Sequence, residues 1–192
     1  MITVVKPGTF TTIQDLGRKG FQRLGVPEAG AMDKFSFKIG NLLAGNNENT
    51  PALEMTLFGP ELYFEESAVI AVTGADLLPK VNGKKIKNWS TIKINSKSTL
   101  TFDGPVGNGG RGYIAINGGF TSPDVKKILG SFSTYLPAKF GGYLGRPLTE
   151  GDHFTNSSEK KISNNQQLKS PPVFKDKETL RIIFGPQQDR FF

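Results

Sequence analysis

Glycine and proline interrupt this 192-residue sequence so often that a long helix cannot form over most of its length. The 23 glycines and 12 prolines separate short apolar segments at intervals typical of strands joined by turns. We expect strands at residues 2–5, 52–57, 62–64, 68–72, 91–94, 100–102, 112–116 and 180–184. Many short strands with frequent turns are typical of a barrel or a sandwich, so the chain is expected to be mainly β.

One segment has a clear helical pattern. From Lys34 to Leu43 the apolar residues recur at helical spacing (Phe35, Ile39, Leu42 and Leu43). Asp33 suits the N-cap, where its carboxylate can accept backbone N–H bonds, and Gly45 suits the C-terminal stop. A second short helix is expected around residues 125–129, after Pro123-Asp124.

The positive charge of the chain is concentrated in one stretch. The formal net charge is +7, and six lysines lie between residues 80 and 97, namely Lys80, Lys84, Lys85, Lys87, Lys93 and Lys97. Asn82-Gly83 is a pair favoured in two-residue hairpin turns, because both positions tolerate a positive φ. Only Trp89 offers an aromatic ring there, and no nucleic-acid-binding signature accompanies it. A solvated lysine-rich hairpin is the simplest interpretation, and anionic small molecules or an acidic partner are the alternatives.

The composition changes near the C-terminus. Residues 156–178 are polar, contain Pro171-Pro172 and have no strand or helix periodicity over most of their length, which indicates a linker or long loop. A new apolar run follows and ends at Phe192. We therefore expect a domain at 1–155, a linker at 156–178 and the start of a truncated second unit at 179–192.

Several chemistries are excluded by residue content. The sequence has no cysteine and one histidine, His153, so thiol catalysis and multi-histidine metal sites are ruled out, and no metal site is expected. It has no G-x-x-x-x-G-K-[ST] phosphate loop and no G-x-S-x-G elbow. No apolar stretch approaches the ~20 residues of a membrane helix, and the N-terminus lacks a signal-peptide layout, so a cytoplasmic location is expected.

The remaining candidates are polar residues next to glycines and strand ends. Gln14, Asp15, Arg18 and Asp33 lie in a glycine-punctuated stretch, and Asp76 directly follows an apolar strand. Glu54 alternates with apolar residues in one strand, and Arg111 and Tyr113 share a face of another. Ser131 and Thr134 are nucleophiles by residue type alone. For each of these residues a turn, a salt bridge or a packing role is the competing explanation.

These residues lie in motifs that resemble a known family. TTIQDLGRKGFQRLGVPEAGAMD, ALEMTLFGPEL, VTGAD, GGRGYIAINGGF, LGSFSTYL, GGYLGRPLTEGD and GPQQDRF occur in order along the chain. Together they are similar to the biotin-dependent carboxyltransferase-like family, which includes allophanate hydrolase subunit 2, the carboxyltransferase part of urea amidolyase and the C subunit of 5-oxoprolinase. The resemblance covers nearly the whole chain apart from the linker, but only the first half of the two-halved family architecture.

The resemblance implies a fold and an activity. The fold would be a cyclophilin-like β-barrel with one or two short helices. The activity would be that of the C subunit of ATP-dependent 5-oxoprolinase, a hydrolase that cleaves 5-oxo-L-proline to L-glutamate, with homologues of the A and B subunits as partners; a homo-oligomer is also possible. In that scheme the acceptors or general base come from Asp15, Asp33, Glu54 or Asp76. The substrate-binding residues are Gln14, Arg18, Arg111, Tyr113, Ser131 and Thr134.

Other activities remain open within the family. A carboxyltransferase of a urea carboxylase or allophanate hydrolase system would need a biotinylated carrier that this chain lacks. A regulatory antagonist of a histidine-kinase inhibitor would bind protein without chemistry. Prolyl isomerisation rests on fold analogy alone. ATP would be a co-substrate of the assembled complex, and biotin enters only with the carboxyltransferase alternative.

Overall fold

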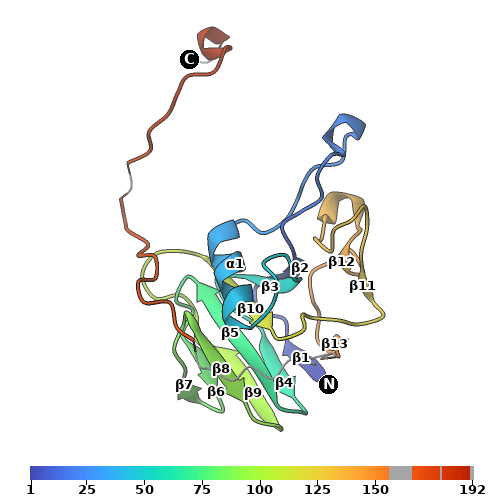
Figure 1. Cartoon of the computed structure of the whole chain (residues 1–192), viewed down its shortest axis with the longest axis vertical. Helices are drawn as coiled ribbons and strands as arrows, with labels where there is room; N and C mark the ends of the chain where they lie inside the picture. The colour runs from blue at the N-terminus through green and yellow to red at the C-terminus, as the bar shows by residue number, and fades with distance from the viewer. Residues whose placement is uncertain (156–165, 178, 191–192) are drawn as a thin grey trace.

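The computed structural model describes residues 1–155, 166–177 and 179–190, and most of the described secondary structure is β (Figure 1). The strands are β1 (Ile2–Lys6), β2 (Phe10–Gln14), β3 (Ala52–Thr56), β4 (Glu61–Phe64), β5 (Ala68–Gly74), β6 (Pro79–Val81), β7 (Lys84–Lys85), β8 (Ser90–Ile94), β9 (Ser98–Phe102), β10 (Arg111–Ile116), β11 (Val125–Lys126), β12 (Gly142–Tyr143) and β13 (His153–Phe154). The helical elements are α1 (Lys34–Leu43) and the short 3-10 turns η1 (Gln22–Leu24), η2 (Leu136–Ala138) and η3 (Gln188–Arg190). The mainly-β prediction is confirmed.

Two antiparallel sheets enclose the main core. One has the order β13-β1-β4-β9-β6-β7 and the other has the order β2-β3-β10-β5-β8. Apolar side chains from both sheets form one buried cluster, with Val4 and Leu62 from the first sheet and Leu53, Val72 and Ile114 from the second. No strand pairing joins the two sheets within the described residues, so the expected barrel is not closed and the arrangement is an open two-sheet sandwich.

Helix α1 covers the other face of the second sheet. Phe37 packs edge-on against Tyr113 of β10, and small residues such as Ala71 and Ala115 make room for the helix. Gly40 allows a close approach, because a Cβ there would lie 2.8 Å from the Thr73 Oγ1 atom of β5. The sheet is therefore sandwiched between the main core and α1.

The predicted limits of α1 are confirmed. The Asp33 side chain accepts a hydrogen bond from the Ser36 N–H at 3.0 Å, and Gly45 has a φ of 75° just beyond the last turn. The second predicted helix is wrong: Val125–Lys126 is strand β11, which pairs with β12. A helix of only five residues, 125–129, is too short to be stable by itself. Pairing with β12 therefore determines the local structure.

The hairpin prediction is also confirmed. Strands β6 and β7 pair with Val81 opposite Lys84, and the turn residues Asn82 and Gly83 have φ values of 49° and 76°. Strand β2 was not predicted, because its FTTIQ sequence has few apolar residues. No helix in the described part of the chain has the length and apolarity needed to cross a membrane.

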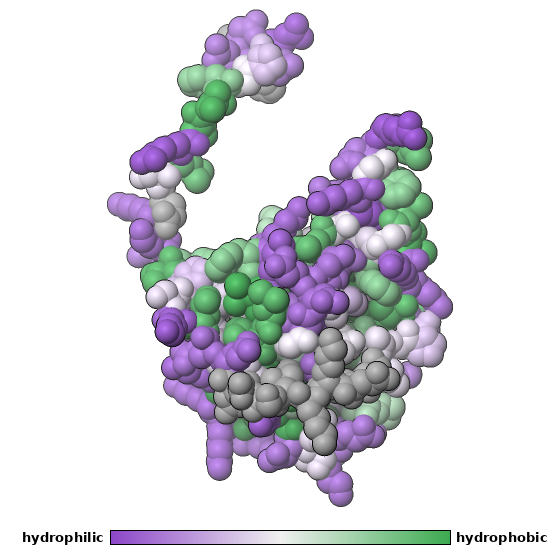
Figure 2. Space-filling view, in the orientation of Figure 1, coloured by the Kyte–Doolittle hydropathy of each residue, from purple (hydrophilic) through white to green (hydrophobic). Residues whose placement is uncertain are grey.

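The C-terminal part of the chain separates into two described pieces. Residues 166–168 run along the free edge of β8, whereas residues 179–190 lead away from the sheets (Figure 1). The strand predicted at 180–184 is wrong: these residues pair with no strand within the described part of the chain, and Ile183 is 98% exposed. Figure 2 shows apolar residues on the segment that leads away from the sheets. Residues 156–165 and 178 of the predicted linker lie outside the described residues, so the domain boundaries stay a prediction.

Candidate functional site

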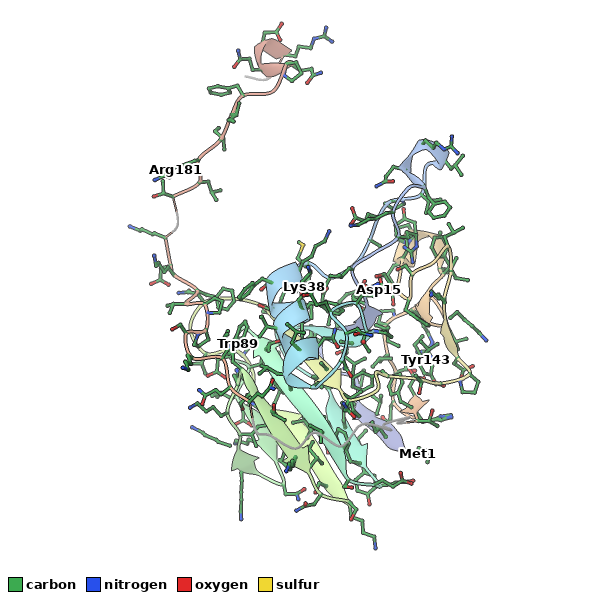
Figure 3. All side chains as sticks on the ribbon, viewed as in Figure 1. Met1, Asp15, Lys38, Trp89, Tyr143 and Arg181 are labelled. Carbon is green, nitrogen blue, oxygen red and sulfur yellow. The ribbon has the colours of Figure 1, made fainter. Side chains whose placement is uncertain are left out.

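The ten candidate residues fall in three places. Figure 3 labels Asp15, which belongs to the first of them, and Trp89, which lies beside the third. One group lies where β2 meets the 131–134 segment and comprises Gln14, Asp15, Arg18, Ser131 and Thr134. A second group lies where α1 begins over β3 and β10 and comprises Asp33, Glu54, Arg111 and Tyr113. Asp76 stands apart from both groups, just after β5.

The Asp15 carboxylate is fully engaged by its neighbours. Its Oδ1 accepts hydrogen bonds from the Ser131 hydroxyl at 2.6 Å, the Ser133 hydroxyl at 2.5 Å and the Gly17 N–H at 2.8 Å. Its Oδ2 accepts from the Phe132 N–H at 2.6 Å, and the residue is 1% exposed. A carboxylate with four donors and no solvent access is suited to fixing the 131–133 segment onto β2, not to taking a proton from a substrate.

Gln14 and Arg18 contact the same segment. The Gln14 amide donates to the Thr12 hydroxyl at 3.0 Å and lies 3.5 Å from the Thr134 carbonyl oxygen, while the Thr134 hydroxyl donates to the Ile13 carbonyl. Arg18 donates through Nη2 to the Ser133 carbonyl at 2.5 Å. Burial lowers the pKa of Arg18, although the Asp15 charge works in the opposite direction. The segment is thus held by side chains from β2 and the loop after it.

The second group fixes the start of α1. Glu54 accepts hydrogen bonds from the Tyr113 hydroxyl and the Met32 N–H, each at 2.8 Å, and pairs with Arg111 Nη1 at 3.0 Å. The Tyr113 hydroxyl in turn accepts from the Asp33 N–H at 2.8 Å. Burial first, and then the Glu54 charge, raises the pKa of Tyr113, so its hydroxyl remains a donor. Both Asp33 oxygens accept from Ser36, so this carboxylate caps the first turn of α1.

Asp76 differs from the other three predicted carboxylates. It is exposed, and its Oδ1 accepts hydrogen bonds from the Leu78 N–H at 3.0 Å and the Asn88 side-chain amide at 3.1 Å. Its Oδ2 has no hydrogen-bond partner among the described residues. Gly74, at the end of β5, turns the chain toward this position with a φ of 88°, and a Cβ at Gly74 would lie 2.5 Å from the Arg111 carbonyl oxygen. A buried strand therefore delivers one free carboxylate oxygen to the surface.

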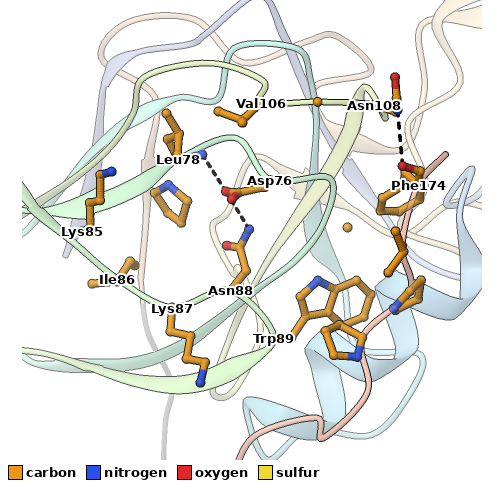
Figure 4. Close-up of a pocket in the computed structure, with 16 residues that line it drawn as sticks. Asp76, Leu78, Lys85, Ile86, Lys87, Asn88, Trp89, Val106, Asn108 and Phe174 are labelled. Carbon is orange, nitrogen blue, oxygen red and sulfur yellow. Dashed lines mark hydrogen bonds between the residues drawn. The ribbon is translucent and has the colours of Figure 1, made fainter. Parts of the chain in front are cut away.

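Asp76 lines a pocket of about 610 Å³ (Figure 4). One wall is the β6–β7 hairpin with the residues on either side of it (Leu78, Pro79, Lys85, Ile86, Lys87, Asn88 and Trp89), and another is the loop at 106–108. Trp89 has a φ of 59°, which is unusual for a bulky side chain, and backbone outliers of this kind concentrate at functional sites. The pocket is the concave site to which a sequence-predicted carboxylate contributes a free oxygen.

The pocket is bordered on its remaining side by residues 166–174, which we call the strap. The Thr91 N–H donates to the Gln166 carbonyl at 2.8 Å, and the Leu168 N–H donates to the Trp89 carbonyl at 2.9 Å, so the strap extends the sheet at β8. Its residues 171–174 line the pocket, and the Asn108 amide lies 3.4 Å from the Phe174 carbonyl. Sequence reasoning missed this role; the apolar Val173-Phe174 pair inside a polar stretch was the only signal for it.

The polar atoms of the pocket define what it can bind. The Asn88 Oδ1 is buried and has no partner among the described residues, and the Asn88 amide nitrogen donates to Asp76. The Asp76 Oδ2 atom is therefore the acceptor oxygen that the pocket offers to an N–H or O–H donor. Lys85 and Lys87 add positive charge to the lining. No group of three or more histidine, aspartate or glutamate side chains within the described residues could hold a metal ion.

Comparisons with known proteins found a matching family, relatives of similar sequence and solved structures with a similar fold. Residues 24–192 match the family described as carboxyltransferase domain, subdomain A and B. The chain is 39% identical to urea amidolyase of Saccharomyces cerevisiae over 96% of its length, and 33% identical to the 5-oxoprolinase C subunit of Escherichia coli over all of it. The crystal structure of Kluyveromyces lactis urea amidolyase superimposes on 89% of the chain with a TM-score of 0.77 and 38% identity. The chain spans 10% of each of the two urea amidolyases and 60% of the E. coli protein.

Proposed function

Because the chain belongs to the carboxyltransferase domain family, subdomain A and B, we propose that it is a component of an enzyme assembly that acts on a small amide. The specific proposal is the role of the C subunit in a 5-oxoprolinase, which acts with homologues of the A and B subunits to open the lactam of 5-oxo-L-proline to L-glutamate. Alignment of the whole chain with the C subunit of a 5-oxoprolinase supports this choice.

The observation that carries the proposal is the free acceptor oxygen of Asp76 in its pocket. A lactam or amide presents an N–H group, and the Asp76 Oδ2 atom has no donor among the described residues. A pocket of about 610 Å³ lies within the range of small-molecule sites, roughly 300–1,000 Å³. The lysines of the lining supply positive charge for the carboxylate of 5-oxoproline.

Asp76 is the residue to which we assign acid–base chemistry. Its exposed carboxylate can accept the proton of an attacking water or of an amide nitrogen, as a general base does. Asn88 acts as a positioning residue, because its amide nitrogen donates to the Asp76 Oδ1 atom and leaves Oδ2 for the substrate. The partly engaged carboxylate is thus kept in one orientation within the pocket.

ATP is proposed as a co-substrate of the assembled complex. It would supply the activation that a stable lactam needs before hydrolysis. The sequence has no phosphate-binding loop of the G-x-x-x-x-G-K-[ST] type, so we assign ATP to the partner proteins of the assembly. The contribution of this chain is to bind and orient the amide.

Carboxyl transfer to a urea-type amide is the second candidate. It is favoured by the 39% identity to S. cerevisiae urea amidolyase and the 38% identity to the K. lactis structure. An N–H group of urea would meet the same Asp76 oxygen. This reaction would require a biotinylated carrier protein as the carboxyl donor, whereas 5-oxoproline cleavage would not.

The two candidates are separated by reconstitution. The chain is co-expressed with homologues of the A and B subunits from the same genome, and ATP hydrolysis is measured with and without 5-oxoproline. Asp76→Asn should lower the 5-oxoproline-dependent rate by roughly 100-fold or more, since a general base contributes about 10²–10⁴. Asp103→Asn is the matched control, because Asp103 is exposed and outside the pocket lining.

Two results would redirect or end the proposal. Carboxylation of urea in the presence of a carboxylated biotin carrier, without 5-oxoproline-dependent ATP hydrolysis, would establish the second candidate in place of the first. Full activity of the Asp76→Asn variant in either assay would show that the Asp76 pocket is not the site.

A further inference from the structure

We propose that buried Arg18 forms a second binding site, for a small oxyanion that also carries a hydrogen-bond donor, separate from the Asp76 pocket. Arg18 is 1% exposed, yet it makes no ion pair with a carboxylate of the described residues. Its Nη2 donates to the Ser133 carbonyl, while its Nε and Nη1 have no partner among the described residues. A buried guanidinium with two open donors is costly to desolvate, so these donors point to an acceptor that binds there.

The nearest acidic residue in the sequence does not satisfy Arg18. The hydrogen-bond partners of the Asp15 carboxylate are hydroxyl or backbone N–H groups of Ser131, Ser133, Phe132 and Gly17. The Asp15 charge therefore lies close enough to affect Arg18 electrostatically but provides no hydrogen bond to it. The open donors of Arg18 are left for a ligand.

The surroundings hold the guanidinium in one place. The Phe140 ring lies against it, with 4.8 Å between the Arg18 Cζ and the ring centroid. Gly141 closes another side, because a Cβ there would lie 3.0 Å from Arg18 Nη2 and would overlap the Ser133 carbonyl oxygen. A guanidinium that is stacked and anchored before a ligand arrives loses little freedom on binding.

A second open polar atom lies on the same segment. The Oε1 of Gln14 is buried without a partner among the described residues, and the Gln14 amide nitrogen faces the Thr134 carbonyl, the residue after the one that holds Arg18. Arg18 requires an acceptor and Gln14 requires a donor. A ligand that reaches both atoms would carry an anionic oxygen and an O–H or N–H group, as a hydroxy acid or a partly protonated phosphate does, and the Gln14 variant described below tests whether one ligand meets both.

The adjoining cavity has the charge that an anion prefers. A pocket of about 640 Å³ is lined by Arg18 and Lys19, and no acidic side chain of the described residues is part of its lining. Asn49 also lines it and is oriented by a hydrogen bond of 2.8 Å from the Leu16 N–H to its Oδ1. This pocket shares no lining residue with the Asp76 pocket, so the two sites are separate.

The test observes the Arg18 Nε–H group directly by NMR. The full chain, labelled with ¹⁵N, is titrated with sodium phosphate, sodium glycolate and sodium acetate, and with sodium chloride at the same ionic strength. The Arg18 resonance is identified by its absence from an Arg18→Lys spectrum or, if that variant does not fold, by sequential assignment of the wild type. We expect phosphate and glycolate to move this resonance to saturation, acetate to bind more weakly because it lacks a hydroxyl, and chloride to have no effect.

Variants connect the response to the proposed residues. Gln14→Leu should weaken glycolate binding by roughly tenfold, as the loss of one hydrogen bond to a bound ligand predicts, and should reduce the difference between glycolate and acetate. Asp76→Asn should leave the anion response unchanged, so failure of the proposed amide chemistry and failure of this site can be told apart. An Arg18 resonance that does not respond to phosphate or to glycolate would overturn the proposal and leave ordered water as the partner of these atoms.

Discussion

Replacing Asp15 by asparagine tests whether this residue is structural or catalytic. The change keeps the shape of the side chain but removes its charge and converts one acceptor oxygen to a donor NH₂ group. If the NH₂ group takes the place of Oδ2, it faces the Phe132 N–H, which lies 2.6 Å from that oxygen in the native protein. If the amide is reversed, the NH₂ group faces Ser131, Ser133 and Gly17 instead. Neither orientation satisfies all four donors.

The expected cost follows from these contacts. A hydrogen bond to a charged group contributes about 1.5–3 kcal/mol, and a buried donor left without an acceptor costs about 1–3 kcal/mol more. We therefore expect Asp15→Asn to lower the free energy of unfolding by about 3–5 kcal/mol. For a chain of this size each kcal/mol corresponds to about 2–4 °C, so a loss of about 3 kcal/mol lowers Tm by about 6–12 °C.

Urea denaturation followed by circular dichroism measures the change in unfolding free energy. Asp103→Asn is the matched control: Asp103 is exposed and its side chain pairs with Lys80 at the surface, so its substitution should cost less than about 1 kcal/mol. A loss below about 1 kcal/mol for Asp15→Asn, together with loss of activity in the reconstituted complex, would refute the structural role and restore Asp15 as a catalytic candidate.

Three further predictions concern other parts of the chain. Asp33→Ala should lower the free energy of unfolding by about 0.5–2 kcal/mol, because the Ser36 N–H loses its cap; an unchanged denaturation midpoint would contradict this. Burial alone would raise the pKa of Asp152, but hydrogen bonds from Arg146 and the Thr149 N–H outweigh burial and lower it. The stability from this pair is therefore present above the ordinary aspartate pKa and is lost as pH falls through the lower folded-state pKa, so Arg146→Gln should raise the pH midpoint of acid unfolding; an unmoved midpoint would contradict the pairing. Trypsin should cleave after Lys169 at least roughly tenfold more slowly than after Lys175, because the strap is hydrogen-bonded to β8 directly before Lys169; equal rates would show that the strap is not docked.

Local signals in the sequence predicted α1 well and distant pairings poorly. The N-cap at Asp33 and the stop at Gly45 act within a few residues of the helix, so a sequence pattern contains them. Strand β11 forms because it pairs with β12 at residues 142–143. The sequence pattern around residues 125–129 does not indicate that distant partner. The strand predicted at 180–184 failed for the complementary reason: its apolar pattern is present, but no partner strand lies beside it within the described residues.

The candidate carboxylates show a similar limit. Position next to a glycine or a strand end identified Asp15, Asp33, Glu54 and Asp76 alike, since residue type and spacing do not reveal hydrogen-bond partners. In the structure they differ in their hydrogen-bond donors. Glu54 accepts from Tyr113, Arg111 and the Met32 N–H, whereas the Oδ2 atom of Asp76 has no donor among the described residues. The sequence can therefore propose candidate carboxylates, but the hydrogen-bond partners of each carboxylate in the structure are needed to decide which of them is available to a substrate.

The strap shows how one composition led to a linker prediction and also allows a docked segment. A tail that is polar and contains two prolines cannot form a helix or an independent strand, which is why the sequence indicated a linker. The same composition suits a segment that pairs with the edge of an existing sheet. Gln166 and Leu168 need only the backbone groups of Thr91 and Trp89, and the residues from Pro171 to Phe174 line the pocket. Because β8 would otherwise present unpaired N–H and C=O groups, docking of the strap protects that edge while it completes the wall beside Trp89. The edge of the second sheet and one wall of the Asp76 pocket are therefore covered by the same few residues, and a change that releases the strap should expose both at once.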